Sequence, residues 1–148
     1  MNLEIKNKKA YFDYFITDTV EVGIVLEGRE VKSIINGKVN LKGSWCGIDN
    51  GEMWVYNMHI SNYMDSANAN LNLLTKYDPI RKRKLLLHKK QIRKFNQMKQ
   101  IEGITFVPLK LYFNNGKIKM LMGVCKGKKQ YDKRETIKLR DETRRGFM

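Results

Sequence analysis

The sequence predicts a small closed antiparallel β-barrel, mainly β in class, with short flanking helices and a basic C-terminal tail. Three observations support this fold: "VEVGIVL" alternates apolar with other side chains, and two apolar segments are each interrupted by an Asn-Gly pair. A period of two is typical of strands, and Asn-Gly between such runs is a strong hairpin signal. Several short strands joined by tight turns in 148 residues favour one small barrel.

The N-terminal part is predicted to contain a strand followed by a short helix. Residues 20–26 place one row of apolar side chains on the inner face of the strand: Val20, Val22, Ile24 and Leu26. Glu21 and Gly23 then face the other side. In "EGREVKSIINGK" apolar residues recur three and four apart over 31–35, and Asn36-Gly37 supplies a stop, so a short helix is expected there.

Two hairpins and a second helix complete the predicted elements. Apolar and aromatic runs flank Asn50-Gly51, and the same arrangement recurs around Asn115-Gly116. Pro108 cannot donate to a neighbouring strand, so it indicates a sheet edge or a bulge. The run "RKRKLLLHKKQIRKFNQMKQ", residues 81–100, is interpreted as a helix that begins after Pro79, with one apolar face: Leu85, His88, Ile92 and Phe95.

Composition restricts the partners of this domain. Hydrophobic residues make up 42% of the chain, and 29 Lys and Arg against 15 Asp and Glu give a net charge of +14. This surplus favours a polyanion, either nucleic acid or an anionic membrane surface. No apolar run approaches the ~20 residues of a spanning helix, and no signal peptide is recognisable, so a cytoplasmic protein is expected. Cys46 and Cys125 are interpreted as reduced core thiols.

The basic residues concentrate in two segments. Between Asp78 and Phe95, eight Lys or Arg accompany one acid. A solvated helix face normally mixes signs, so phosphate contacts are favoured there. The second segment, residues 126–148, has apolar residues that share no helical face, so we expect a tail that is disordered when free and folds on an anionic partner. A frayed basic terminus without a specific role is the alternative.

The sequence does not predict an enzyme. His59 and His88 lack metal-ligand spacing, no nucleophile elbow is present, and no acidic cluster would hold catalytic magnesium. "GVCKGKK" departs from the phosphate-loop pattern in both its glycine spacing and its last residue. The chain is therefore interpreted as a basic barrel of oligonucleotide-binding type without cofactor or metal. In "AYFDYF" the candidates for stacking on unpaired bases are Tyr11, Phe12, Tyr14 and Phe15.

From end to end, the chain resembles small protein B, the SsrA-binding family that is the bacterial partner of transfer-messenger RNA (tmRNA). The matching stretches are "NKKAYFDYFI", "EVGIVLEGREVKSIINGKVNL", "DPIRKRKLLLHKKQI", "TFVPLKLYF" and "GKKQYDKRETIK". The resemblance implies a six-stranded barrel, taken as residues 1–125, and a tail over 126–148. It also implies trans-translation, in which the protein binds the transfer-RNA-like domain of tmRNA. With elongation factor Tu and GTP, the alanyl-charged tmRNA is delivered to ribosomes stalled on truncated messages.

Carried over position by position, the resemblance implies tmRNA contacts at Asn7, Glu21 and Leu86. It implies further contacts at basic residues around Leu86: Arg81, Arg83, Lys84 and Lys89. Each of the first three has a structural alternative: a turn cap for Asn7, a sheet-surface carboxylate for Glu21 and a core position for Leu86. Phe12 stands where many members have histidine, and a phenyl ring retains stacking but not a side-chain hydrogen bond.

The tail carries the second set of implied contacts. Tyr131, Asp132, Lys133 and Arg134 match the segment that the family places in the decoding centre, where the tail is helical in the empty messenger channel of the small ribosomal subunit. Other basic residues expected to contribute are Lys128, Lys129, Lys138, Arg140, Arg144 and Arg145. The tail ends at "RRGFM", sooner than in many members.

Other readings of the sequence remain open. The main alternative is a general ribosomal or single-stranded-RNA-binding barrel protein without tmRNA specificity. An RNA-processing enzyme and a membrane-surface protein are weaker alternatives, the latter because no basic stretch carries an opposing apolar face. A monomer is expected.

Overall fold

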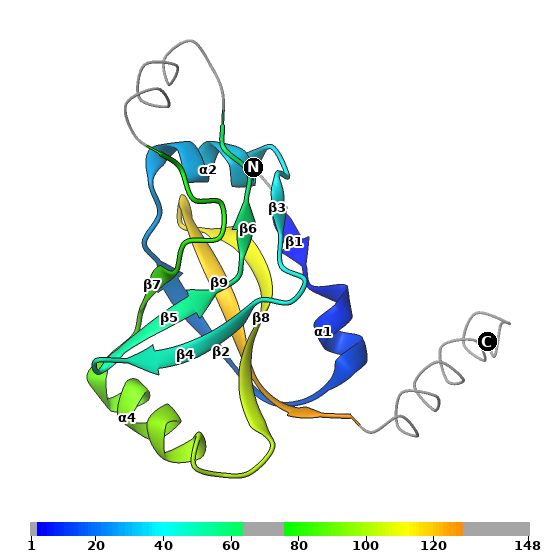
Figure 1. Cartoon of the computed structure of the whole chain (residues 1–148), viewed down its shortest axis with the longest axis vertical. Coiled ribbons are helices and arrows are strands. Elements are labelled where there is room, and N and C mark those ends of the chain that lie inside the picture. The colour runs from blue at the N-terminus through cyan, green and yellow to red at the C-terminus, as the bar shows by residue number, and fades with distance from the viewer. Residues whose placement is uncertain (1–2, 64–75, 129–148) are drawn as a thin grey trace, which may run out of the picture.

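A computed structural model describes residues 3–63 and 76–128 of the chain (Figure 1). Nine strands and three helices lie in this part: β1 (Glu4–Lys6), α1 (Lys8–Asp13), β2 (Tyr14–Ile24), α2 (Gly28–Ile35), β3 (Val39–Asn40), β4 (Trp45–Asp49), β5 (Glu52–Tyr56), β6 (His59–Ile60), β7 (Arg83–Leu86), α4 (Lys89–Met98), β8 (Ile104–Asn114) and β9 (Lys117–Gly127). The mainly β class predicted from the sequence is confirmed.

The large sheet closes on itself through its strand pairings. Its order is β1-β8-β4-β5-β7-β2-β9, and β8 also pairs with β9, so six strands form a ring with β1 added outside β8. Every pairing is antiparallel. The ring encloses one main core, which includes Val22, Met53, Leu85 and Met120. Helix α2 lies at one end of the ring and α4 at the other, with α1 at the side (Figure 1).

Both predicted hairpins and the predicted strand are present. Asn50 and Gly51 join β4 to β5 with φ of 52° and 73°, and Asn115 and Gly116 join β8 to β9 with φ of 53° and 72°. Two consecutive positive φ angles are the geometry that makes Asn-Gly favourable in two-residue hairpins. In β2, Val22 and Ile24 are buried while Glu21 is exposed, as the alternation predicts. Pro108 marks a register shift between β8 and β9, the predicted bulge.

The predicted helix over residues 81–100 is wrong in its first half. Residues 83–86 form β7, which pairs with β5 and with the end of β2, and α4 begins only at Lys89. The run follows a period of two instead of 3.6, because Arg83 and Leu85 point into the ring and Leu86 points out. His88 lies at the N-cap of α4 in a capping box with Gln91, and not on an apolar helix face.

The last strand of the barrel extends past position 125, where the sequence analysis placed the end of the barrel. Strand β9 continues to Gly127, and the backbone N–H of Lys128 donates to the carbonyl of Asp13 at 2.9 Å. Residues 126 and 127, which the sequence analysis placed in the tail, are thus part of β9. The predicted disorder and helix of the tail concern residues 129–148, which lie outside the described residues. Cys46 and Cys125 are buried and free, as expected.

Candidate nucleic-acid interface

Two of the predicted contact residues, Glu21 and Leu86, meet in one shallow hollow on the outside of the ring. The hollow has a volume of about 380 Å³ and lies where β2, β7 and β9 meet the start of α4. Its lining consists of Glu21, Gly23, Leu86, Leu87, His88, Gln91 and Lys119. Residues 65 positions apart in the sequence are therefore brought together by the pairing of β2 with β7.

Gly23 allows Leu86 to lie across the neighbouring strand. The two residues are paired between β2 and β7, and a Cβ added at Gly23 would lie 3.2 Å from the Cβ of Leu86 and 3.3 Å from its Cδ1. Leu86 is 54% exposed, so it is not a core residue, and the alternative of a core position is wrong. An exposed leucine beside a polar hollow offers apolar contact to a partner.

The carboxylate of Glu21 is held by two side chains from β8. The hydroxyl of Tyr112 donates to Oε2 at 2.5 Å, and Nδ2 of Asn114 donates to Oε1 and Oε2 at 3.2 and 3.3 Å. The hydrogen bond from Tyr112 is the main reason that the pKa of Glu21 lies below its ordinary value, and Asn114 and the charge of Lys119 contribute in the same direction. Burial and the neighbouring carboxylate raise the pKa of the Tyr112 phenol.

The four predicted basic contacts divide into two groups. Lys89 is exposed at the first residue of α4, and Lys84 is half-buried on β7, 3.5 Å from Glu52. Arg83 differs from the prediction of a surface contact, because it is 0% exposed and its Nε donates to Glu30 at 2.7 Å. Arg81 is part-buried and donates to the same carboxylate. The strand geometry of β7 explains this outcome, since alternate residues point inward.

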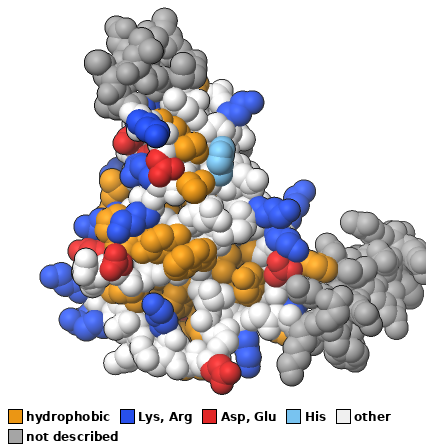
Figure 2. Space-filling model, viewed as in Figure 1, with side chains coloured by type: hydrophobic (Ala, Val, Ile, Leu, Met, Phe, Trp, Pro, Cys, Tyr) orange, Lys and Arg blue, Asp and Glu red, His pale blue; other side chains and the backbone are white. Residues whose placement is uncertain are grey.

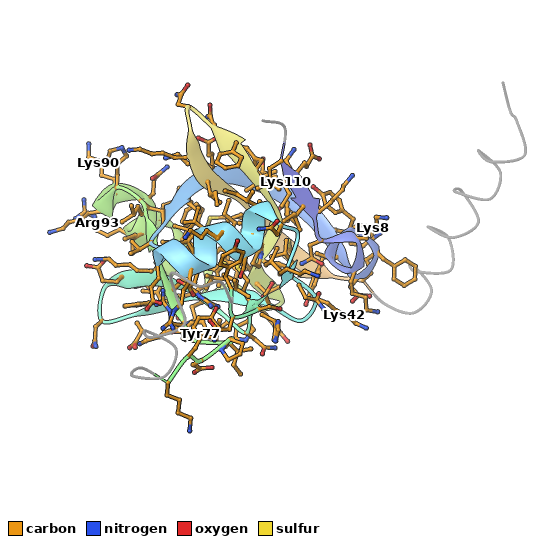
Figure 3. The ribbon with its side chains drawn as sticks, turned by 90° about the horizontal axis from the view of Figure 1, so that it is seen from above. Lys8, Lys42, Tyr77, Lys90, Arg93 and Lys110 are labelled. Carbon is orange, nitrogen blue, oxygen red and sulfur yellow. The ribbon has the colours of Figure 1, made fainter. Side chains whose placement is uncertain are left out.

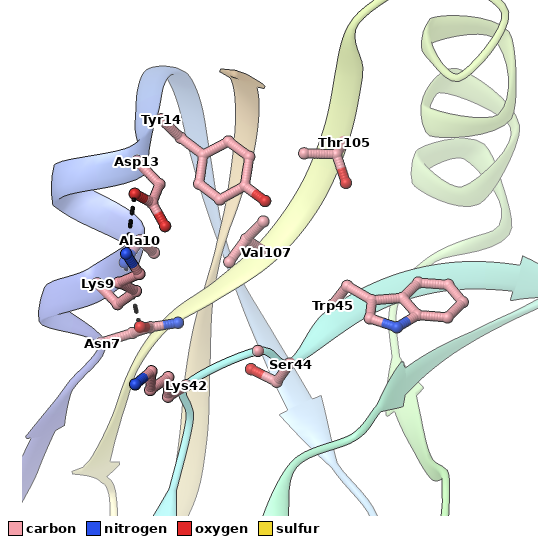
Figure 4. A pocket seen from close by; sticks show the side chains of 11 residues that line it. Asn7, Lys9, Ala10, Asp13, Tyr14, Lys42, Ser44, Trp45, Thr105 and Val107 are labelled. Carbon is pink, nitrogen blue, oxygen red and sulfur yellow. Dashed lines mark hydrogen bonds and ion pairs between the residues drawn. The ribbon is translucent and has the colours of Figure 1, made fainter. Parts of the chain in front are cut away.

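Asn7 lies in a different hollow, of about 340 Å³, between α1 and the start of β4 (Figure 4). Its side chain is buried, donates to the carbonyl of Pro108 at 2.8 Å and accepts from the N–H of Ala10 at 3.2 Å. Asn7 therefore caps α1 and fastens it to β8. Polar, cationic and aromatic side chains line this hollow, among them Lys9, Tyr14, Lys42 and Trp45.

Three of the four aromatic candidates for base stacking, Tyr11, Phe12 and Phe15, have a cation over the ring. The ammonium of Lys6 lies 4.8 Å from the centroid of Tyr11, and that of Lys9 lies 5.6 Å from Phe12. Phe15 is 46% exposed, with the ammonium of Lys128 5.1 Å from its ring. These rings lie beside positive charge, which is the combination that binds unpaired nucleotides in single-strand grooves.

A further aromatic pair was not predicted as a binding feature. Trp45 and Tyr56 stack with their centroids 4.3 Å apart, and Trp45 is 47% exposed. Hydrophobic side chains gather over β4 and β5, with basic side chains on both sides (Figure 2). Lys90 and Arg93 project from α4 on one side of the barrel, whereas Lys8 and Lys42 lie on the opposite side (Figure 3).

The sequence pattern did not identify Tyr112, Asn114, Gln91 and Lys119 as site residues. Period-two alternation in "KLYFNNGKIK" places Tyr112 and Lys119 on an outward face, but nothing in it indicates a carboxylate partner 91 residues away. In the described part of the chain, no group of three His, Cys, Asp or Glu could hold a metal ion. No helix there is both long and apolar enough to cross a bilayer. Of the predicted tail contacts, only Lys128 lies within the described residues.

Comparison with known proteins identifies the family. The model of the SmpB protein family matches residues 4–146. The chain belongs to the SmpB family. The SsrA-binding protein of Limosilactobacillus reuteri (strain DSM 20016) is 50% identical over 143 residues, which cover 97% of this chain and 87% of the relative. That of Geobacillus sp. (strain WCH70) is 52% identical over 139 residues, covering 94% and 86%.

A solved structure supports the same relationship in three dimensions. It is described as "tmRNA-SmpB: a journey to the center of the bacterial ribosome", and its chain matches with a TM-score of 0.67 at 40% identity. The match covers 90% of this SmpB-family chain and 94% of the solved one. The barrel and its flanking helices are thus a fold shared with an SmpB structure.

Proposed function

We propose that this SmpB-family protein binds tmRNA and delivers it to stalled ribosomes for trans-translation. The proposal is carried by one observation: Glu21 and Leu86, which the family resemblance marks as RNA contacts, lie together in one exposed hollow. The net charge of +14 and the exposed Lys89 support a polyanionic ligand. Relatives named SsrA-binding proteins and the solved tmRNA-SmpB structure support the same ligand.

The proposed interface on the barrel consists of Glu21, Leu86, Lys84 and Lys89. Arg83 is left out because its guanidinium is enclosed, and Arg81 serves first to hold Glu30. Asn7 contributes by fixing α1 beside the second hollow. The action is binding and delivery without catalysis, so labelled tmRNA incubated with the protein and magnesium should remain intact.

The tail is proposed to act at a second partner. Its basic residues would lie along the empty messenger channel and decoding centre of the small ribosomal subunit, with Tyr131, Lys133 and Arg134 as the central contacts. Elongation factor Tu and GTP would join through the alanyl-charged tmRNA. The protein would act as a monomer in the cytoplasm, where its ribosomal partner works.

The barrel interface is tested by measuring tmRNA affinity for Glu21→Ala and Leu86→Asp. Both variants should bind more weakly than the wild type while circular dichroism shows a folded barrel. Glu102→Ala and Ile101→Asp are matched controls, because these exposed residues after α4 lie outside the hollow and should leave affinity unchanged. Folded Glu21 and Leu86 variants with wild-type affinity would move the interface elsewhere. Equal affinity for tmRNA and transfer RNA would favour a general RNA-binding protein instead.

A further inference from the structure

We propose that the hollow between α1 and β4 binds one unpaired nucleotide of ribosomal RNA, with the base stacked on Trp45 and the phosphate at Lys42. The hollow, of about 340 Å³, is within the size range of small-molecule sites (Figure 4). The inference rests on the proposed function, since it takes RNA as the partner of the protein. Neither Trp45 nor Lys42 is among the contacts that the family resemblance implies.

The indole of Trp45 is covered on one face and directed into the hollow with the other. Tyr56, its cross-strand partner on β5, stacks on the indole with the centroids 4.3 Å apart and 18° between the ring planes. On the other side of β4 lies β8, whose Thr105 and Val107 line the hollow. The face of the indole away from Tyr56 is therefore directed toward the hollow, and Trp45 is 47% exposed.

Gly47 gives this aromatic pair the room that it occupies. It lies two residues beyond Trp45 on β4, and an added Cβ would lie 2.9 Å from Cζ3 of Trp45 and 3.3 Å from Cε2 of Tyr56. Both rings thus lie over Gly47, and they restrict one another before a ligand arrives. A base on the second face of the indole would extend a stack that already exists, so binding loses less side-chain entropy.

The polar groups of the hollow suit the rest of a nucleotide. Lys42 is exposed, and its ammonium forms no ion pair with a residue that the structure describes. The ammonium of Lys9 lies 3.4 Å from the carboxylate of Asp13, so Lys42 is the cation that remains for a phosphate. The hydroxyls of Tyr14 and Thr105 are directed into the hollow (Figure 4) and make no hydrogen bond to another described residue. Since a hydroxyl both donates and accepts, these two suit the edge of any base.

This combination favours a nucleotide over other ligands that stack on tryptophan. An arginine side chain would bring its guanidinium beside the ammonium groups of Lys9 and Lys42, which repel it. A neutral sugar would leave Lys42 without a partner. A nucleotide supplies a flat base for Trp45 and a phosphate for Lys42. Because every base has a π-face, stacking tolerates all four bases, and little base preference is expected.

The position of the hollow favours ribosomal RNA over tmRNA as the source of the nucleotide. In the ring of strands β4 lies opposite β2 and β8 opposite β7, so this hollow and the one around Glu21 and Leu86 are on opposite sides of the barrel. The chain also leaves the barrel beside this hollow, because the backbone N–H of Lys128 donates to the carbonyl of Asp13 at 2.9 Å. The tail that follows is proposed to bind small-subunit RNA, which would bring that RNA close to Trp45.

The site is tested with Trp54→Phe, which leaves Trp45 as the only tryptophan of the full chain and its fluorescence as the readout. Titration with the single-stranded RNA hexauridylate should quench Trp45 to saturation, because a base stacks on its ring. Lys42→Ala in this background should weaken the binding by roughly tenfold, the order expected for one hydrogen bond to a charged group. Lys38→Ala is the matched control, since it removes an exposed lysine outside the hollow.

The reverse variant, Trp45→Phe, keeps Trp54 as the only tryptophan and should show no quenching. If hexauridylate leaves Trp45 unquenched, or quenches Trp54 equally, the inference is overturned.

The source of the nucleotide is tested by measuring the affinity of Trp45→Ala for small ribosomal subunits without messenger RNA and for tmRNA. Affinity for the subunits should fall by roughly tenfold, the order expected for one lost base–aromatic stack, while tmRNA affinity stays unchanged. Lys42→Ala should show the same difference, and it decides the outcome if circular dichroism shows Trp45→Ala unfolded. Weaker binding to tmRNA alone would overturn the assignment to ribosomal RNA. Wild-type tmRNA affinity of Glu21→Ala and Leu86→Asp would instead overturn the proposed tmRNA interface without affecting Trp45 quenching, so the two failures are distinguishable.

Discussion

The buried ion pair between Glu30 and Arg83 shows how single residues determine the barrel. Both side chains are 0% exposed, and Arg83 also donates to the carbonyls of Met58 and Pro79 at 2.6 and 3.1 Å. Arg81 forms a second ion pair with the same carboxylate. Burial alone would raise the pKa of Glu30, but the hydrogen bonds from Arg81, from the backbone N–H of Glu27 and from Arg83 together outweigh it, and the pKa lies below its ordinary value. A residue that the sequence offers as a phosphate contact instead joins α2 to β7.

The loss of Arg83 should accordingly be a loss of stability. Arg83→Ala removes one member of a buried pair and leaves the Glu30 charge poorly compensated, which typically costs about 3–5 kcal/mol. Chemical denaturation should show this decrease in the free energy of unfolding. Lys90→Ala removes an equal charge from the exposed face of α4 and should change the free energy of unfolding by less than about 0.5 kcal/mol. If Arg83→Ala is as stable as the wild type but binds tmRNA more weakly, the stability prediction is wrong and Arg83 belongs to the tmRNA interface.

At the scale of elements, the sequence predicted best where the signal is local. Asn-Gly turns and the alternation of β2 depend on neighbouring residues, so both hairpins and the outward position of Glu21 were predictable. The few residues around Leu85 and Leu86 fit a helical period as well as a period of two. They form a strand because they pair with β5 and β2 in the folded barrel. The hydrogen-bond partners of Glu21 could not be predicted from the sequence either, because they depend on the relative positions of β2 and β8.

Close packing of β8 against β9 gives a prediction at the same scale. A Cβ at Gly123 would lie 2.7 and 2.9 Å from side-chain atoms of Leu109, which is fully buried. Gly123→Ala should therefore destabilise the barrel by roughly 1–3 kcal/mol through overpacking. At Gly28, the first residue of α2, no atom lies within 4 Å of an added Cβ, so Gly28→Ala should not destabilise. Thermal unfolding measures the stability of both variants, and equal stability of Gly123→Ala and Gly28→Ala would contradict the steric argument.

At the scale of the whole molecule, the barrel and the tail offer different kinds of surface. The barrel presents a structured hollow around Glu21 and a second one around Asn7, and it places Lys90 and Arg93 on one side and Lys8 and Lys42 on the other (Figure 3). The tail sequence offers charge without an apolar face. Positive charge on several sides suits a protein that lies between two RNA molecules, tmRNA and ribosomal RNA, as proposed.

This division predicts that the tail acts after tmRNA has been bound. A chain ended after Lys128 keeps every described element and should bind tmRNA within a few-fold of the wild type, yet fail to support tagging of stalled proteins in a reconstituted translation reaction. Lys133→Ala combined with Arg134→Ala should cause most of the same loss, because hydrogen bonds to charged groups are worth roughly 1.5–3 kcal/mol each. Lys38→Ala combined with Lys99→Ala removes the same charge from exposed barrel positions and should leave tagging intact. Tagging by the shortened chain would show that the barrel alone admits tmRNA to the ribosome, and the proposed role of the tail would then be wrong.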